Sequence, residues 1–106
     1  IYTLSLHDAL PISSLGRYDE RTGTFVVLAG SQVDLSRPVL KSAGAADRRD
    51  ELFGDVGGTR LLGDDQSFNS PSAAAVFVLG GSQNGWIEWI NGQGQTLDYV
   101  YRRKKD

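Results

Sequence analysis

One stretch of the chain, residues 70–81, constrains the fold more than any other. Ser70 precedes Pro71, which is typical of a helix start: a serine hydroxyl accepts hydrogen bonds from first-turn amides, and proline has no amide to leave unsatisfied there. An Ala-Ala-Ala-Val-Phe-Val-Leu run then leads to Gly80-Gly81, a pair that ends helices. A helix that is apolar on nearly all sides must be covered all round. The sequence therefore predicts a central buried helix near residues 71–80.

Short β-type stretches separated by turn residues lie on either side of this helix. Residues 15–18 and 25–28 flank an Asp-Glu-Arg-Thr-Gly cluster, an arrangement typical of a hairpin. A second helix is expected over residues 43–56, where Gly57-Gly58 would end it. Further strands are expected at residues 33–36, 59–62, 66–68 and 86–90. The order of elements predicts an α+β fold, with a mostly antiparallel sheet and its hairpins packed on two helices.

The second helix and the C-terminal segment carry more detailed expectations. In the helix, Ala45, Leu52 and Val56 fall near one face, and the charged residues 48–51 fall largely on the other. Residues 91–94, Asn-Gly-Gln-Gly, are typical of a hairpin loop. After this loop, Thr96 either extends a last strand or caps a short helix through residue 101.

The first twelve residues differ in character from the rest of the chain. A signal peptide is excluded because polar residues interrupt the apolar run and no basic region precedes it. Alternation over residues 1–6 fits an edge strand. Residues 2–12 also match the translation of a widely used sequencing adapter without a mismatch, and we favour this interpretation. Residues 1–12 are then expected to have no structural role, residues 13–101 to form one domain, and residues 102–106 a basic tail.

The chain contains no cysteine, no methionine and one histidine, His7. His7 lies in the adapter-like segment, so the remainder lacks the side chains of Ser-His-Asp and Cys-His sites and of sulfur or imidazole metal sites. We therefore expect no catalytic residue, no metal, no cofactor and no enzyme activity. The missing methionine leads us to expect a fragment of a longer product. No apolar run has the length of a membrane span, and a cytoplasmic location is expected.

The overall charge gives no sign of a nucleic-acid footprint. Eleven Lys and Arg residues stand against thirteen Asp and Glu residues, for a formal net charge of −2, whereas nucleic-acid-binding domains commonly carry a basic face. The tail residues Arg102, Arg103 and Lys104 either contact phosphates or form a solvated end. The sequence does not show whether five other arginines lie close together in the fold. They are Arg17, Arg21, Arg48, Arg49 and Arg60.

Two tryptophans and the helix start supply the other candidate contacts. In a strand over residues 86–90, Trp89 shares the apolar face with Ile87 and is expected in the core. Trp86 faces the other side and is either an exposed platform for a stacked base or a ring that closes one end of the core. Ser70 and Ser72 either cap the helix or accompany amides that hold a phosphate.

Several segments between residues 15 and 98 resemble those of known families. They are Gly16-Arg-Tyr-Asp19, Gly23-Thr-Phe-Val-Val-Leu-Ala-Gly-Ser31, Arg49-Asp-Glu-Leu52, Phe68-Asn-Ser-Pro-Ser-Ala-Ala-Ala75, Leu79-Gly80, Asn84-Gly-Trp86, Trp89 and Gly94-Gln-Thr-Leu97. The chain resembles a domain of unknown function that is often found C-terminal to GIY-YIG nuclease domains. Its second half is also similar to RAMA-type domains, which are associated with restriction enzymes and adenine methylases. The sequence contains no GIY or YIG triplet.

The resemblance implies DNA recognition, with a preference for methylated adenine in some members. We expect a non-catalytic accessory module of a prokaryotic nuclease or restriction–modification protein, which binds DNA, modified or not, or positions it for an upstream nuclease domain. The alternative is a structural or protein-interaction domain that docks on its own enzyme partner without direct DNA contact. The expected nucleic-acid contacts are Ser70, Ser72, Asn84, Gly85, Trp86, Arg102, Arg103 and Lys104.

Overall fold

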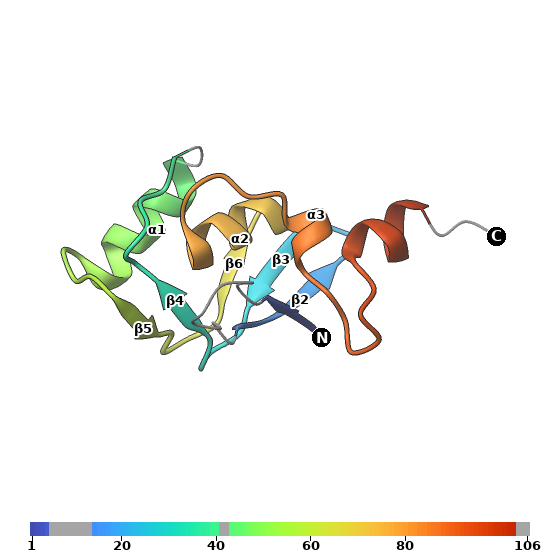
Figure 1. Ribbon diagram of the computed structural model, residues 1–106, viewed down its shortest axis with the longest axis horizontal. Helices are drawn as coiled ribbons and strands as arrows, with labels where there is room; N and C mark the ends of the chain where they lie inside the picture. The colour runs from blue at the N-terminus through green and yellow to red at the C-terminus, as the bar shows by residue number, and fades with distance from the viewer. Residues whose placement is uncertain (5–13, 41–42, 104–106) are drawn as a thin grey trace.

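The computed structural model of the chain describes residues 1–4, 14–40 and 43–103. Two antiparallel sheets and several helices pack around one buried helix, α2 (Figure 1). The elements follow one another as β1 (Tyr2–Leu4), β2 (Ser14–Asp19), β3 (Thr24–Val27), β4 (Gln32–Asp34), α1 (Ala43–Phe53), β5 (Thr59–Leu61), β6 (Gln66–Phe68), α2 (Pro71–Leu79), α3 (Gly85–Glu88) and the π-helix η1 (Asp98–Arg103). The predicted α+β class is confirmed.

The larger sheet has the strand order β1-β2-β3-β6, and a smaller sheet pairs β4 with β5. The predicted hairpin is confirmed, since Asp19 of β2 pairs with Thr24 of β3 across the turn. On β3 the side chains alternate, and Phe25 and Val27 are buried on the face that α2 covers. A Cβ atom on Gly16 of β2 would collide with the Phe25 ring. Glycine at this position therefore lets the sheet hold a large aromatic side chain.

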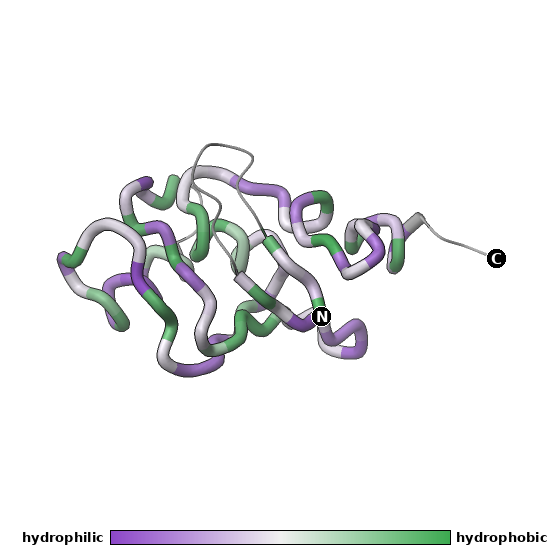
Figure 2. The backbone as a smooth tube through the Cα atoms, turned by 60° about the horizontal axis from the view of Figure 1, so that its bottom comes forward, coloured by the Kyte–Doolittle hydropathy of each residue, from purple (hydrophilic) through white to green (hydrophobic). Residues whose placement is uncertain are grey.

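Helix α2 forms the centre of the core. The Ser70 hydroxyl accepts a hydrogen bond from the Ala73 amide at 3.1 Å, and Pro71 takes the first turn. At the other end, Gly80 adopts a φ of 76°, and its amide donates to the Val76 carbonyl at 2.7 Å. The helix contacts β3, β4 and β6 as well as α1 and α3. The predicted buried helix and both of its ends are confirmed. Elsewhere, several of the loops at the periphery of the molecule are hydrophilic (Figure 2).

Helix α1 differs from the prediction in its end and in its buried face. It ends at Phe53, before residue 56, because Gly54 adopts a left-handed φ of 60°. Leu52 and Val56 are exposed, whereas Arg49 is buried, so the predicted assignment of the faces is wrong for these residues. The Arg49 side chain turns inward because backbone carbonyls accept its hydrogen bonds there.

The segment after residue 84 is a helix, and the predicted strand over residues 86–90 is wrong. The Asn84 side chain accepts a hydrogen bond from the Trp86 amide at 3.1 Å. The Glu88 carboxylate in turn accepts from the Asn84 amide at 2.6 Å. These two bonds satisfy amides of the first turn and favour the short helix α3. Trp89 follows α3 in an extended conformation and is fully buried, so its predicted place in the core is confirmed.

The C-terminal segment closes against the larger sheet. A single antiparallel bridge joins Ile90 and Thr96, so the loop over residues 91–94 reverses the chain without a regular hairpin. The Thr96 hydroxyl accepts a hydrogen bond from the Tyr99 amide at 3.1 Å, and η1 follows. Of the two alternatives for Thr96, the structure thus has the helix cap.

Strand β1 lies where no structural role was expected. Tyr2 and Leu4 are buried and pair with Gly16 and Ser14 of β2. Residues 2–4 therefore form the edge strand that the alternation fits, rather than a segment without a structural role. Residues 5–12 lie outside the described residues, and the adapter origin stays a prediction. Among the described residues, no helix has both the length and the apolar character needed to cross a membrane.

Candidate nucleic-acid interface

Four of the predicted contact residues meet at the junction of α2 and α3. Ser70 and Asn84 cap the two helices through their side chains. The Ser72 hydroxyl accepts a hydrogen bond from the Gly85 amide at 3.0 Å. The Ser70 and Asn84 side chains thus bond within their own helices, and the hydrogen bond between Gly85 and Ser72 joins α3 to α2.

Gly85 and Trp89 both contact the Pro71 carbonyl group at the same junction. A Cβ atom on Gly85 would collide with the Pro71 carbonyl group, so only glycine allows α3 to approach α2 this closely. The buried indole Nε1 of Trp89 donates to the Pro71 carbonyl at 3.0 Å. Because an indole N–H in the core needs an acceptor, this bond sets the orientation of Trp89.

Trp86 of α3 belongs to an aromatic–arginine cluster, which consists of Tyr18, Trp86, Tyr101 and Arg102. The Tyr18 ring meets the Trp86 ring edge-on at a centroid distance of 5.4 Å and the Tyr101 ring at 4.9 Å. The Arg102 guanidinium lies 4.6 Å from the centre of the Trp86 ring. Trp86 is half-buried, and Arg102 covers one of its faces. Two predicted contact residues, Trp86 and Arg102, are therefore brought together.

Two tyrosines of this region, Tyr2 and Tyr18, have raised pKa values. Burial raises the pKa of Tyr2 from 10.0 to about 12, with a further rise from the charge and hydrogen bond of Tyr101. Burial, and next the negative charge of Glu20, raise the pKa of Tyr18. The raised pKa of Tyr18 favours its neutral phenol, and a neutral ring can pack against an aromatic or cationic group.

Arg102 is the exposed edge of the cluster. Its guanidinium Nε lies 3.7 Å from the Asp98 carboxylate one turn earlier on η1, and its side chain is 55% exposed. The Arg102 side chain is thus the solvent-exposed member of this pair, whereas the Asp98 side chain is only 19% exposed. Arg103 is the last residue of η1, and Lys104 lies outside the described residues.

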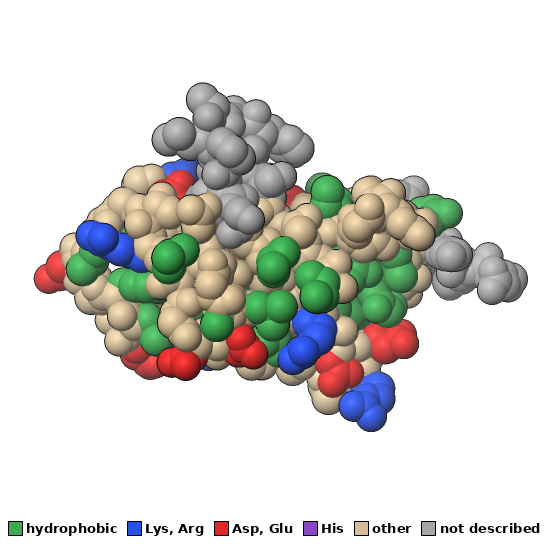
Figure 3. Space-filling model, turned by 90° about the horizontal axis from the view of Figure 1, so that it is seen from below, with side chains coloured by type: hydrophobic (Ala, Val, Ile, Leu, Met, Phe, Trp, Pro, Cys, Tyr) green, Lys and Arg blue, Asp and Glu red, His purple; other side chains and the backbone are tan. Residues whose placement is uncertain are grey.

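The other arginines do not gather into one basic face. Arg17 and Arg21 line a groove beside Tyr18 and Tyr101. Arg48 lies 4.8 Å from the centre of the Phe68 ring and donates to Gln66. Arg49 is buried and Arg60 is exposed on β5, in the other sheet. The face seen from below carries apolar, acidic and basic side chains in mixture (Figure 3).

The prediction from sequence missed Tyr18 and Tyr101. Tyr18 is near the end of β2 and Tyr101 is in η1, so the two rings come from opposite ends of the chain. No local pattern connects such distant residues, and the only signal was an aromatic side chain near the end of each expected element.

The site offers no obvious place for a metal ion. Among residues 1–4, 14–40 and 43–103, no group of three or more His, Cys, Asp or Glu side chains is arranged to hold one. In the same part of the chain, every buried side-chain nitrogen or oxygen has a hydrogen-bond partner. The rings and the guanidinium of the cluster are groups suited to non-covalent contacts with aromatic or charged partners.

Comparison with known proteins gives one assignment. No curated protein and no solved structure matches the chain. A family model described as Domain of unknown function (DUF4357) matches residues 11–101, a range that includes the α2–α3 junction and Trp86 and runs as far as Tyr101. Because this match covers most of the sequence, the chain belongs to the DUF4357 family.

Proposed function

We propose that the protein is a non-catalytic DNA-binding module of a prokaryotic nuclease or restriction–modification protein. The observation that carries the proposal is the aromatic–arginine cluster, because aromatic rings beside arginines form the surfaces on which unstacked bases and phosphates are held. The resemblance to domains that follow GIY-YIG nucleases and to RAMA-type domains supports the same role. The module would work in the cytoplasm and position DNA, modified or not, for an upstream nuclease domain.

The cluster is also continuous with the basic end of the sequence. Residues 102–105 are Arg-Arg-Lys-Lys, and the first of them already covers Trp86. The sequence carries a net charge of −2, so any attraction to phosphates must be local. Binding of this kind is expected to be modest and to weaken steeply as salt rises, since each phosphate contact releases counterions.

Titration of a fluorescently labelled DNA with the protein tests this proposal. Tyr101→Leu removes a ring of the cluster, and Tyr99→Leu is the matched control, because Tyr99 lies on η1 but makes no ring contact with the cluster. We expect Tyr101→Leu to weaken binding about tenfold, as the loss of one stacking ring does. Tyr99→Leu should bind as the parent does. The proposal fails if no DNA binds at low salt, or if both variants bind equally well.

A second candidate is a structural domain that docks on its own enzyme partner. It is favoured by the α2–α3 junction, where Ser70, Ser72 and Asn84 make their hydrogen bonds inside the domain. Trp86→Ala separates the two candidates. A variant that no longer folds supports the structural role of Trp86, whereas a stable variant that has lost DNA binding supports the first proposal.

A further inference from the structure

A groove beside the aromatic–arginine cluster is one part of the surface that the proposed function leaves unassigned. Its volume is about 440 Å³, within the roughly 300–1,000 Å³ common for small-ligand sites. Tyr18 and Tyr101, two members of the cluster, form part of its lining, and most of the remainder comes from the β2–β3 hairpin. The groove therefore joins two tyrosine rings in edge-on contact to the charged side chains of that hairpin.

The charges in the groove are of both signs. Arg17 and Arg21 lie in its lining together with Asp19 and Glu20. Duplex DNA presents two rows of phosphates and hides the faces of its bases, so it would meet the carboxylates and gain nothing from the rings. An unpaired nucleotide presents a base face, a phosphate and, in cytosine, adenine and guanine, an amino group. Rings, guanidinium and carboxylate groups complement these three features respectively.

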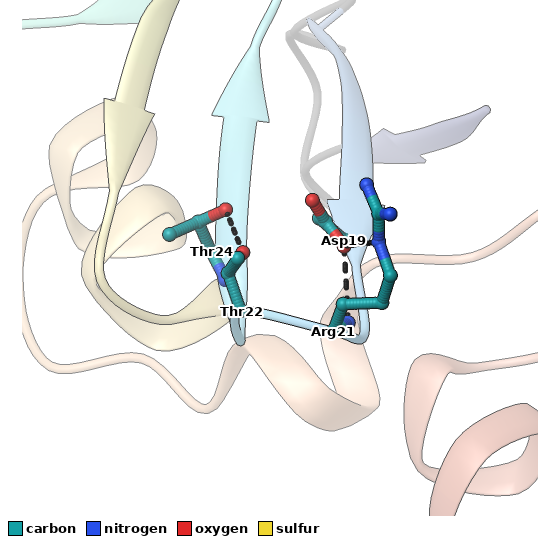
Figure 4. Close-up of polar contacts among 4 residues, drawn as sticks. All are labelled: Asp19, Arg21, Thr22 and Thr24. Atoms are coloured by element: carbon teal, nitrogen blue, oxygen red, sulfur yellow. Dashed lines mark hydrogen bonds and ion pairs between the residues drawn. The ribbon is translucent and has the colours of Figure 1, made fainter.

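Arg21 is positioned so that its side chain can change partner. Its guanidinium Nε lies 3.6 Å from the Asp19 carboxylate, and the two side chains are 88% and 40% exposed (Figure 4). Such an exposed pair contributes little to stability. If a phosphate replaces Asp19 as the partner of Arg21, little stability is lost from the ion pair itself.

The backbone of the turn is held independently of this ion pair. The Arg21 amide donates to the Asp19 carboxylate at 3.0 Å, and the Gly23 amide donates to the Asp19 carbonyl at 2.8 Å. The hydroxyl groups of Thr22 and Thr24 share a hydrogen bond of 2.7 Å. A change at the Arg21 guanidinium therefore leaves the shape of the hairpin intact.

We propose that this groove binds one unpaired nucleotide of a DNA strand. The base lies against Tyr18 and Tyr101, and the phosphate binds Arg21. The inference rests on the proposed function and narrows it, from DNA in general to single-stranded or locally opened DNA.

Fluorescence anisotropy of the full chain with one labelled, cytosine-rich oligonucleotide, alone and annealed to its complement, tests this inference. The single strand should bind about tenfold more tightly than the duplex, because one base gains a stacking contact. Arg21→Gln should weaken binding of the single strand several-fold. The matched control is Arg60→Gln, which removes the same charge from an exposed position on β5, in the other sheet, and should leave binding unchanged.

The outcomes separate the two proposals. Tighter binding of the single strand, lost in Arg21→Gln and kept in Arg60→Gln, supports the groove. Equal binding of single strand and duplex, or equal weakening by the two variants, overturns the groove and leaves DNA binding standing. Absence of binding to either form overturns the proposed function together with the inference.

Discussion

Arg49 of α1 is a buried cation that caps the C-terminal end of the neighbouring helix α2. The last carbonyls of any α-helix have no amide partner inside the helix. In α2 the Phe77 carbonyl accepts a hydrogen bond from the Arg49 guanidinium at 2.8 Å. The same guanidinium donates to the carbonyls of Arg37 and Asp34, at 2.7 and 2.8 Å. A cation at a helix C-terminus is also favoured by the helix dipole. Arg49 therefore connects α1, α2 and the segment after β4.

Replacement of Arg49 by methionine is expected to lower the free energy of unfolding by about 2–4 kcal/mol. Methionine fills the space, but the three carbonyls stay and lose their donor, and an unsatisfied buried acceptor is costly. Urea unfolding followed by tryptophan fluorescence measures the change. Arg60→Met, at an exposed position, should change the free energy of unfolding by less than about 0.5 kcal/mol. Equal stability of the two variants would contradict a capping role for Arg49.

Tyr2 gives the fold a dependence on alkaline pH. Its pKa is raised from 10.0 to about 12 by burial and then by Tyr101, so folding favours the protonated phenol. The resulting stability is fully present below pH 10.0 and is lost as pH rises through about 12. We expect the free energy of unfolding to fall across this window. Tyr2→Phe should show a shallower fall, and identical slopes would show that Tyr2 is not buried in solution.

At the scale of elements, local signals were readable and distant ones were not. Ser70, Pro71 and Gly80 define α2 through contacts within a few residues, and the sequence predicted both of its ends. Asp19 and Gly23 likewise define the β2–β3 hairpin locally. Elements of this kind can be derived from one sequence because propensity and hydrogen bonding agree over a short range.

Helix α3 and the cluster depended on contacts between distant segments. The alternation in Trp-Ile-Glu-Trp-Ile fits a strand, but the packing of Gly85 on Pro71 and the cap at Asn84 favour a helix. The candidate site shows the same division. Trp86 was recognised from its motif, whereas Tyr18 and Tyr101 meet only once the sheet and η1 have formed.

The junction between α2 and α3 can be tested with two glycines. Gly85→Ala places a methyl group against the Pro71 carbonyl, and we expect it to lower the free energy of unfolding by about 2 kcal/mol or more. A Cβ atom on Gly44, in α1, would meet no atom within 4 Å. Gly44→Ala should therefore raise the free energy of unfolding by about 0.5 kcal/mol, because alanine has the higher helix propensity. Urea unfolding of both variants gives the comparison, and two changes of the same sign would contradict the close contact.

At the scale of the whole molecule, β1 connects parts of the chain that are distant in sequence. On one side it pairs with β2, and on the other the Thr3 amide donates to the Ile90 carbonyl at 2.7 Å while the Ile90 amide donates back at 3.0 Å. Tyr2 also touches the cluster through Tyr101. A three-residue strand therefore ties the sheet to the segment that carries Trp86 and η1.

Removal of residues 1–12 tests this connection. A chain that begins at Ser13 keeps α2, the β2–β3 hairpin and most of the core, so we expect it to unfold cooperatively. Its free energy of unfolding should be lower by about 3 kcal/mol, because the buried side chains of Tyr2 and Leu4 are absent. Amide hydrogen exchange should accelerate most at Ile90, which loses its partner on β1, and least within α2. Unchanged stability would show that β1 does not pack in solution, and loss of cooperative unfolding would show that the domain needs a strand in this position.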